Sequence, residues 1–582
     1  MQNEVIIKVA AESEDVEAGK QEQVFSKKDK EKTAPSTTAD THTKNTDGPV
    51  SFPIESVRVE AKKYFKGDEL AADVWINKYA LKDSNGNVYE LTPNDMHRRL
   101  ASEIARVDKR YPNPLTEEEI FNLLKDFKYI IPQGGPMSGI GNDFQISSLS
   151  NCFVIGKDEG ADSYGGIMKI DEEQVQLMKR RGGVGHDLSH IRPGGSAVQN
   201  SALSSTGIVP FMERYSNSTR EVAQDGRRGA LMLSISSRHP DAENFIDAKM
   251  EQGKVTGANV SVRIDDDFMN SVIKEKKYLQ RFPVDSDSPS FVQEIDTTTL
   301  WNKIVHNAWK SAEPGVLFWD TIINESVADC YADIGFKTVS TNPCGEIPLC
   351  PYDSCRLLAI NLYSYVENPF TDNAYFDSEL FSKHVGYAQR IMDDIIDLEL
   401  EKIDTILDKI MSDPECVEIK KTEKELWSNI REKCIQGRRT GIGITAEGDM
   451  LAALGLQYGS DKGIEFSTKV HEALAVECYR GSVRLAKDRG AFPVYDAKKE
   501  ENNPFVGRIK KSDPKLYAEM IKHGRRNIAL LTIAPTGTTS LMAQTTSGIE
   551  PIFLVAYKRR RKVNPNDKDV TVAFIDEVGD SW

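Results

Sequence analysis

Apolar side chains recur every three or four residues in two stretches near residue 100, as expected for amphipathic helices. The first stretch follows Thr92 and Pro93, a typical helix start with Thr as the N-cap and Pro at the first helical position. The second follows Thr116, where Glu119 completes a capping box. We therefore expect a small helical domain over residues 51–140.

Beyond residue 145 the pattern changes to short apolar runs separated by helical stretches. The runs cover residues 149–155, 230–235, 315–319, 357–362 and 528–533. Their length suits buried strands, whereas residues 380–398 have apolar positions at helical spacing. Strands that alternate with helices indicate an α/β fold, which we assign to residues 141–560.

The first 50 residues differ from the rest in composition. From about residue 12 they are rich in Lys, Glu, Asp, Ser and Thr, with too few apolar residues to offset the entropy of ordering. They lack the apolar run of a signal peptide, and no other run reaches membrane-spanning length. We expect a disordered leader over residues 1–50 and no membrane association.

The net charge limits the partners that we expect, and the spacing of the cysteines limits the cellular compartment. The chain has 89 acidic and 74 basic residues and a net charge of -15, which disfavours nonspecific binding to nucleic acid. Its cysteines are scattered, without the density of a secreted disulfide framework. We expect a cytoplasmic protein without a nucleic-acid partner, in which the basic run 558–562 is a solvated face or a local anion contact.

Glycine-rich segments give weaker signals. Residues 181–185 and 441–443 allow tight turns and close approach of the backbone, but neither has the order of a dinucleotide fingerprint. Residues 535–540 directly follow the run 528–533 and offer hydroxyl and backbone N–H groups. This segment fits either a phosphate cradle or an ordinary turn between a strand and a helix.

Two patterns could indicate a metal ion, and neither is complete. His186 and His190 have the spacing of two ligands on a helix, but no third ligand is close in sequence and the surroundings are rich in glycine. The cysteines form no CxxC pair of the kind that binds zinc. We therefore predict no metal site.

The segment around Cys344 carries the strongest chemical signal. Asn342 and Glu346 flank this thiol between two prolines, Pro343 and Pro348. A cysteine here could be a nucleophile, a metal ligand, a redox partner or a radical carrier. A buried, inert thiol is the commonest alternative, but it leaves the flanking amide and carboxylate unexplained. The segment therefore indicates a small reactive site, to which Cys152 and Cys355 are candidate partners.

Four motifs together resemble the large catalytic subunit of ribonucleotide reductase, and most closely its adenosylcobalamin-dependent class. They are Ser-Asn-Cys-Phe-Val at 150–154, Arg-Arg-Gly-Gly-Val-Gly at 180–185, Asn-Pro-Cys-Gly-Glu-Ile at 342–347 and Ala-Pro-Thr-Gly-Thr-Thr-Ser at 534–540. They occur in the family's order, and the likeness runs from about residue 55 to about residue 560. It implies a ten-stranded α/β barrel of two parallel half-barrels, with a central finger loop at residues 342–350.

The resemblance also implies roles for five residues. Cys344 would be the thiyl radical that takes the 3′ hydrogen of the ribose. Glu346 would be the base on the 3′ hydroxyl, and Asn342 would orient the substrate. Cys152 and Cys355 would supply two electrons, let the 2′ hydroxyl leave as water, and end as a disulfide.

Further residues follow from the same resemblance. The substrate would contact Asn151, Cys152, Gly183, Asn342, Pro343, Cys344, Gly345, Glu346, Pro535, Thr536, Gly537, Thr538 and Thr539. Of these, residues 535–539 would grip the phosphates. A deoxynucleotide effector would bind Asp162, Ser163 and Arg192, and residues 224–229 would pass its identity to the active site.

The implied reaction reduces ribonucleotides, with diphosphates favoured, to deoxyribonucleotides for DNA synthesis. Its cofactor would be adenosylcobalamin and its reductant a thioredoxin-like or glutaredoxin-like protein, and the chain would form a homodimer. The family's C-terminal cysteine pair has no match here, so residues 561–582 would be an incomplete C-terminal segment. A separate polypeptide would then carry the missing part, or the sequence is a fragment, or small dithiol proteins reach the cysteines directly.

Two alternative functions share these motifs. One is the large subunit of a class I reductase, which needs a separate radical-generating subunit. The other is an inactive nucleotide-binding regulator with the same fold, a reading that the complete set of five active-site residues disfavours.

Overall fold

The computed structural model describes residues 50–156, 162–222, 229–251, 253–554, 563, 570–575 and 581–582. The predicted leader up to residue 49, most of the loop 224–229 and the basic run 558–562 lie outside these residues. No helix in the described part of the chain is long and apolar enough to cross a membrane.

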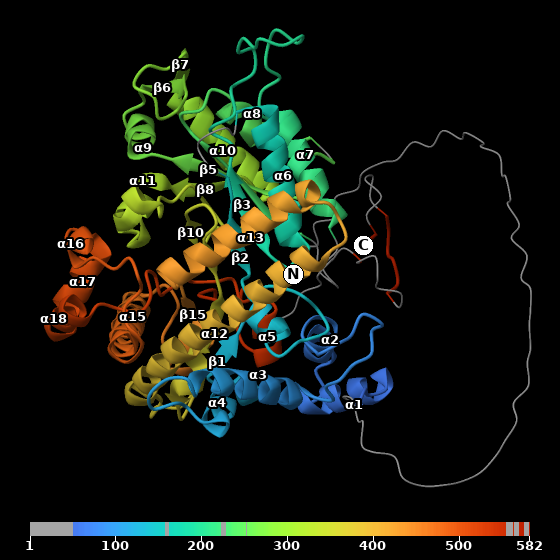
Figure 1. Ribbon diagram of the computed structural model, residues 1–582. Coiled ribbons are helices and arrows are strands. Elements are labelled where there is room, and N and C mark those ends of the chain that lie inside the picture. Colours follow the sequence, from blue (N-terminus) through green and yellow to red (C-terminus); the bar gives the residue numbers. More distant parts are fainter. Residues whose placement is uncertain are drawn as a thin grey trace, which may run out of the picture. The chain divides into compact units, whose positions relative to one another are not determined.

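Four helices form the N-terminal part (Figure 1): α1 (Ile54–Tyr64), α2 (Glu69–Lys78), α3 (Pro93–Asp108) and α4 (Glu117–Leu124). Both predicted helix starts are confirmed. Thr92 is the N-cap of α3. At α4 the Thr116 hydroxyl accepts from the Glu119 N–H at 3.2 Å, while the Glu119 carboxylate accepts from the Thr116 N–H at 2.8 Å. The helices pack on one another through a shared apolar core.

The larger sheet has six strands in the order β11-β2-β3-β4-β5-β8. They are β2 (Cys152–Val154), β3 (Gly183–Asp187), β4 (Leu231–Ser236), β5 (Asn259–Ile264), β8 (Gly315–Phe318) and β11 (Ser354–Cys355). β2, β3, β4, β5 and β8 are parallel, and β11 joins β2 antiparallel. Between these strands lie α6 (Tyr164–Met178), α7 (Val209–Glu221), α8 (Ala242–Asp247), α9 (Asp266–Ile273), the hairpin β6 (Lys277–Phe282) and β7 (Phe291–Asp296), and α10 (Thr297–Ser311). Helices that connect parallel strands cover both faces of the sheet. The strands are therefore buried on both sides, which explains their continuous apolar runs.

The smaller sheet has the order β1-β12-β15, with β1 (Ile130–Pro132), β12 (Leu357–Asn361) and β15 (Gly441–Thr445). β12 and β15 are parallel. The run 528–533, predicted as a strand, forms only an isolated bridge, Leu531 with Ile442 of β15.

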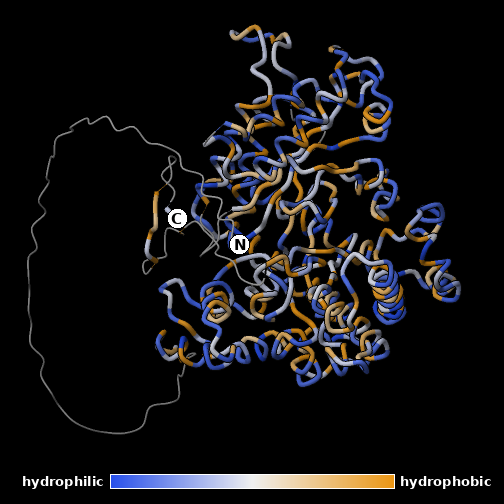
Figure 2. The backbone as a smooth tube through the Cα atoms, turned by 180° about the vertical axis from the view of Figure 1, so that it is seen from behind, coloured by the Kyte–Doolittle hydropathy of each residue, from blue (hydrophilic) through white to orange (hydrophobic). Residues whose placement is uncertain are grey.

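Long helices cover the sheets. They are α12 (Ser378–Ser412), which contains the predicted helix 380–398, α13 (Val417–Gly437) and α15 (Asp461–Arg489). α12 packs against both α13 and α15 (Figure 1). Apart from one hairpin, the other elements of the described residues are α5 (Gly135–Gly139), α11 (Trp319–Glu325), β13 (Val366–Glu367), β14 (Tyr375–Phe376), α14 (Glu447–Ala453), α16 (Ala497–Glu500), α17 (Pro504–Ser512), α18 (Pro514–His523), α19 (Thr539–Ala543) and three 3-10 turns. Hydrophobic stretches follow the interior strands, whereas the outer helices carry many hydrophilic positions (Figure 2).

A short hairpin lies between the two sheets. Its strands are β9 (Ser340–Thr341) and β10 (Pro348–Leu349), and residues 342–347 form its tip. On one side an ideal Cβ at Gly185 of β3 would lie 1.8 Å from the Thr341 carbonyl oxygen, so only glycine permits this approach. On the other side the Thr532 hydroxyl donates to the Glu346 carbonyl at 3.3 Å. The predicted finger loop is thus a hairpin held by β3 of the larger sheet and by the segment 528–533, which bridges to β15 of the smaller sheet.

Candidate active site

The side chain of Asn342 organises the hairpin tip. Its Nδ2 donates to Glu346 Oε2 at 2.6 Å and to Cys152 Sγ at 3.1 Å. Its Oδ1 accepts from the Ile347 N–H at 3.0 Å. Asn342 is fully buried, so these bonds satisfy an amide that has no access to water. One side chain therefore joins a carboxylate, a thiol and the backbone of the turn.

The backbone of the tip is fixed by its own hydrogen bonds. The Gly345 N–H donates to the Asn342 carbonyl at 3.0 Å, and the Asn342 N–H donates to the Ile347 carbonyl at 3.2 Å. Gly345 has a φ of +87°, while a Cβ there would meet no atom within 4 Å. Glycine is therefore needed for the conformation rather than for space. Asn259 of β5 adds a 2.7 Å bond to the Pro343 carbonyl.

This turn places two functional groups differently. Cys344 is exposed at the end of the hairpin. Glu346 is half-buried, and burial raises the pKa of its carboxyl above the ordinary value although the bond from Asn342 opposes this shift. A carboxylate with a raised pKa is a better proton acceptor near neutral pH.

Cys152 and Cys355 lie directly opposite each other on the antiparallel strands β2 and β11. Cα atoms of such partners are about 4.5–5.5 Å apart, within the range that a disulfide requires. Both thiols are buried, at 5% and 1% exposure. The fold thus brings together two cysteines that are far apart in the sequence.

The two thiols have different electrostatic surroundings. Burial raises the pKa of both, to about 12 for Cys355. At Cys152 the Glu346 carboxylate raises the pKa further. At Cys355 the guanidinium groups of Arg356 and Arg439 oppose the effect of burial. Both thiols therefore keep their protons at neutral pH, and the Cys355 side is better suited to hold a transient negative charge.

A buried polar network, which the sequence did not suggest, lies behind this pair. Arg356 is fully buried, and its Nη1 is 3.3 Å from both Ser150 Oγ and Cys434 Sγ. The Ser150 hydroxyl donates in turn to Glu399 at 2.7 Å. The buried guanidinium and carboxylate are therefore linked through one hydroxyl. Arg356 directly follows β11 and Ser150 lies two residues before β2, so this link joins the two cysteine strands.

Residues Asn151 and Gly183 lie beside the hairpin tip. A Cβ at Gly183 would lie 3.0 Å from Pro343 Cγ, so glycine lets the tip sit against β3. The Asn151 N–H donates to the Cys355 carbonyl at 3.1 Å, and its carbonyl accepts from the Gly183 N–H at 2.8 Å. A substrate contact through the backbone of Asn151 can therefore use only the second lone pair of its carbonyl.

The segment 535–539 begins three residues after Thr532, which contacts the hairpin tip. Thr536 has a φ of +52°, a strained conformation for a β-branched residue. Its buried hydroxyl accepts from the Gly548 N–H at 2.8 Å. Within the described residues the N–H groups of Gly537 and Thr538 donate no hydrogen bond. The Thr538 hydroxyl is 2.7 Å from Tyr79 Oη, which connects this segment to the N-terminal helices.

The three predicted effector residues lie together at the start of α6. Arg192 donates to Asp162 from its backbone at 2.8 Å and from Nε at 2.9 Å. Ser163 is the N-cap of α6 and accepts from the Gly166 N–H at 3.0 Å. The loop that would accompany them falls largely outside the described residues, since only residue 229 of it is described.

The weaker sequence candidates have structural roles. Residues 183–185 and 441–443 lie in strands β3 and β15. His186 is buried beside Gln174, and burial lowers its pKa to about 3, so it is neutral at physiological pH. Where the structure describes the chain, no group of three or more His, Cys, Asp or Glu residues is arranged to hold a metal ion.

Two family models match most of the chain. The family model "Ribonucleotide reductase, barrel domain" matches residues 150–580, and "Ribonucleotide reductase, all-alpha domain" matches residues 65–137. The barrel match confirms the predicted α/β barrel class, and the described parallel strands lie in a six-stranded and a three-stranded sheet.

Curated relatives match most of the chain. A "Vitamin B12-dependent ribonucleoside-diphosphate reductase" of Mycobacterium tuberculosis is 29% identical over 84% of this chain and 62% of its own length. One of the same name from Thermoplasma acidophilum is 29% identical over 83% of this chain and 63% of its own length. A "Ribonucleoside-diphosphate reductase subunit alpha" of Chlamydia pneumoniae is 25% identical over 74% of this chain and 43% of its own length.

The chain thus spans about six tenths of the length of these two B12-dependent relatives, and its barrel-domain match covers most of its residues. The chain belongs to the family of ribonucleotide reductase large subunits.

Proposed function

We propose that the chain is the catalytic body of an adenosylcobalamin-dependent reductase that converts ribonucleoside diphosphates to 2′-deoxyribonucleoside diphosphates. One observation carries the proposal. Beneath the exposed Cys344, the Asn342 amide contacts both Glu346 and Cys152, and Cys152 lies opposite Cys355. A radical carrier, a base and a two-electron reductant are therefore within reach of one sugar.

Each of these active-site residues would have its own role in the reaction. The Cys344 thiyl radical takes the 3′ hydrogen atom, and Glu346 accepts the proton of the 3′ hydroxyl. The 2′ hydroxyl takes a proton from the Cys152–Cys355 pair and leaves as water. The pair supplies two electrons and becomes a disulfide, and Cys344 returns the hydrogen to C3′. The sum is one ribonucleotide and one dithiol giving one deoxyribonucleotide, one disulfide and one water.

The position of Cys344 fits an external radical source. Its exposure at the end of the hairpin makes the thiol accessible from outside the two sheets. Bound adenosylcobalamin would supply the radical that oxidises this thiol. Several relatives are named as vitamin B12-dependent, which supports this cofactor.

The substrate and the effector would bind at different residues of the chain. The N–H groups of Gly537 and Thr538, with the hydroxyls of the same segment, would hold the diphosphate. A deoxynucleotide effector would bind at Asp162, Ser163 and Arg192 in a homodimer. A thioredoxin-like or glutaredoxin-like protein would reduce the disulfide after each turnover, directly or through cysteines on another polypeptide.

The test is an activity assay on the purified chain. With adenosylcobalamin, a small dithiol, a ribonucleoside diphosphate and each deoxynucleotide effector in turn, we expect deoxynucleotide from the parent chain and none from Cys344→Ala. Cys416→Ala is the matched control, because Cys416 is also exposed but lies at the N-cap of α13.

Two outcomes would overturn the proposal. Product from Cys344→Ala would remove the radical role of that residue. Product only after addition of a separate metal-bearing subunit would favour the class I alternative.

A further inference from the structure

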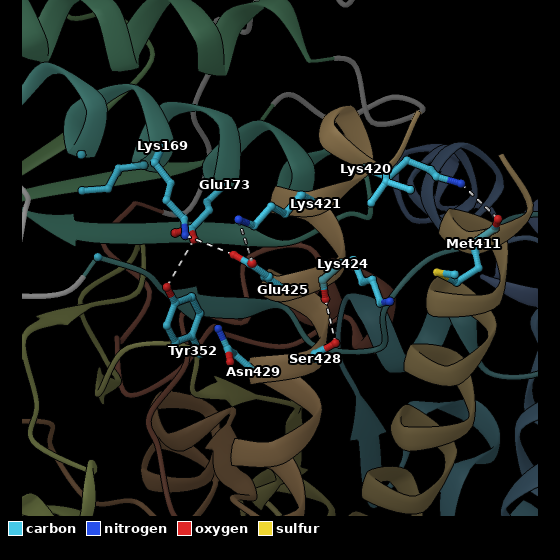
Figure 3. Close-up of a pocket in the computed structure, with 14 residues that line it drawn as sticks. Lys169, Glu173, Tyr352, Met411, Lys420, Lys421, Lys424, Glu425, Ser428 and Asn429 are labelled. Carbon is cyan, nitrogen blue, oxygen red and sulfur yellow. Dashed lines mark hydrogen bonds and ion pairs between the residues drawn. The ribbon is translucent and has the colours of Figure 1, made fainter. Parts of the chain in front are cut away.

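A surface cavity of about 750 Å³ lies between α6 and α13, outside the proposed substrate and effector residues. Its walls come from the two helices, the C-terminal end of α12 and Tyr352 (Figure 3). Ligand sites commonly have volumes of about 300–1,000 Å³. The cavity is therefore large enough for a small organic molecule.

Lysines supply most of the charge in this cavity. Lys169 and Lys421 share one carboxylate, Glu425, at 3.4 and 3.8 Å. Lys424 has no carboxylate within ion-pair distance among the residues that the structure describes. The chain as a whole is acidic, with a net charge of -15. The lysines of this cavity outnumber its carboxylates, Glu173 and Glu425, and this local excess of cations favours an anion.

Lys420 has a different role. Its ammonium group donates to the carbonyls of Met411 and Asp413 at 3.1 and 2.9 Å, at the C-terminal end of α12 (Figure 3). A lysine in this position stabilises a helix end. The cations available to a ligand are therefore Lys169, Lys421 and Lys424.

The rest of the lining combines apolar side chains with the polar groups of Glu173, Glu425, Ser428 and Asn429. Ile170, Met411 and Val417 contribute aliphatic surface, and Tyr352 contributes its ring. The Tyr352 hydroxyl donates to Glu173 at 3.2 Å, so the polar groups of these two buried residues are engaged with each other. The cavity combines a cationic rim with an apolar wall, which suits a molecule that carries phosphates on a ring or chain.

We propose that this cavity binds a small polyphosphate ligand with an apolar ring. Its phosphates contact Lys169, Lys421 and Lys424, and its ring packs against Tyr352 and Ile170. Lysines that serve only to keep a helix surface hydrated have no reason to lie beside a cavity with apolar side chains in its wall. The site is distinct from Asp162 and Arg192, which lie near the start of α6.

The location gives such a ligand access to the cysteine strands. The Tyr352 N–H donates to the Val154 carbonyl of β2 at 2.8 Å, and Tyr352 precedes Cys355 of β11 by three residues. Tyr352 also has a φ of +66°, an unusual conformation for an aromatic residue. Bound ligand therefore contacts a turn that is hydrogen-bonded to β2 and leads directly into β11, the two strands of the proposed redox pair.

The experiment measures binding of ATP and inorganic tripolyphosphate by calorimetry, with no need for catalytic activity. The Asp162→Ala, Arg192→Ala double variant serves as the background, since it removes the proposed effector site. In that background we expect ATP to bind, and more tightly than tripolyphosphate. Adding Lys421→Gln and Lys424→Gln should weaken ATP binding by about tenfold or more, since losing one charge-assisted contact costs roughly one decade.

The matched control is Lys462→Gln with Lys469→Gln on α15. Lys469 pairs with Glu465 at 2.7 Å with the same i,i+4 spacing as Lys421 and Glu425, but outside the cavity. ATP should also protect Lys424 from an amine-reactive label read by mass spectrometry. Equal weakening by both pairs of substitutions, unchanged affinity in the Lys421 and Lys424 variant, or no binding in the background would overturn the proposal. Equal affinity for ATP and tripolyphosphate would overturn the role of the apolar wall.

Discussion

At the scale of single residues, the hairpin tip depends on one amide. Asn342 donates to an acid and a thiol that lie far apart in the sequence, and it does so while fully buried. A buried polar group with several partners defines one arrangement of those partners, because any other leaves it unsatisfied. The chemistry assigned to this site therefore rests on side chains that hold one another in place.

We predict that Asn342→Ala lowers kcat by about 10- to 100-fold, since a hydrogen bond to a charged group contributes roughly 1.5–3 kcal/mol. Steady-state kinetics with a ribonucleoside diphosphate provide the measurement, with circular dichroism to verify folding. The control is Asn259→Ala, which removes a bond to the tip backbone but not to Glu346 or Cys152. A larger loss in the control than in Asn342→Ala would contradict the role of the amide.

The pH dependence of kcat tests Glu346. Because burial raises the pKa of this carboxyl, its basic form is reached only above the ordinary range for Glu. A base must be deprotonated to accept a proton, so kcat should rise with pH through the raised pKa and level off above it. In Glu346→Gln the rate should be low and lose this rise. An unchanged acid limb in Glu346→Gln would show that another group titrates.

At the scale of secondary-structure elements, glycines set how closely the hairpin approaches the sheets. Gly185 of β3 meets the Thr341 carbonyl, and Gly441 of β15 meets the Cys355 sulfur, where an added Cβ would lie 2.5 Å away. Each of these contacts joins segments from different parts of the chain. Strands β3 and β15 can therefore approach the hairpin and the cysteine pair this closely only because glycine has no side chain.

We predict that Gly185→Ala lowers the free energy of unfolding by about 1–3 kcal/mol, the usual cost of overpacking, and also lowers activity by displacing the hairpin. Denaturant unfolding measures the first effect and the reductase assay the second. Gly507→Ala in α17 is the control, since a Cβ there meets no atom within 4 Å. Equal stability of Gly185→Ala and Gly507→Ala would contradict the close approach.

At the scale of the whole molecule, buried charges join the N-terminal helices to the barrel region. Arg489 of α15 bonds Asp108 of α3 at 2.6 Å, and Asp393 and Asp394 of α12 at 2.8 and 2.7 Å. These side chains are fully buried. Removing one charged residue from such a cluster leaves the other buried charges unpaired. This destabilises the fold by far more than the intact ion pair stabilises it.

Arg489→Met should therefore destabilise the protein by about 3–5 kcal/mol, as measured by equilibrium denaturation. Its control is Arg431→Met, which breaks the exposed pair with Asp404 and should cost at most about 1 kcal/mol. If the two variants unfold at the same denaturant concentration, the cluster does not stabilise the junction.

Local signals and long-range contacts differed in how well they could be predicted. The helix starts at Thr92 and Thr116 were predictable because a capping residue and its partner lie within one turn. The resemblance named Cys344 and its partners because they stand in recognisable motifs. Asn259, Thr532 and Arg356 escaped notice because their contacts to the tip or the cysteine strands join distant segments and leave no local pattern.

The central claim is that Cys344 carries the radical, and electron paramagnetic resonance tests it most directly. The chain would be mixed with adenosylcobalamin, a nucleoside diphosphate and an effector, then frozen within milliseconds. We predict a radical signal that changes when the cysteine β hydrogens are replaced by deuterium, that disappears in Cys344→Ala and that persists in Cys416→Ala. A signal that survives in Cys344→Ala with the same deuterium sensitivity would contradict the account.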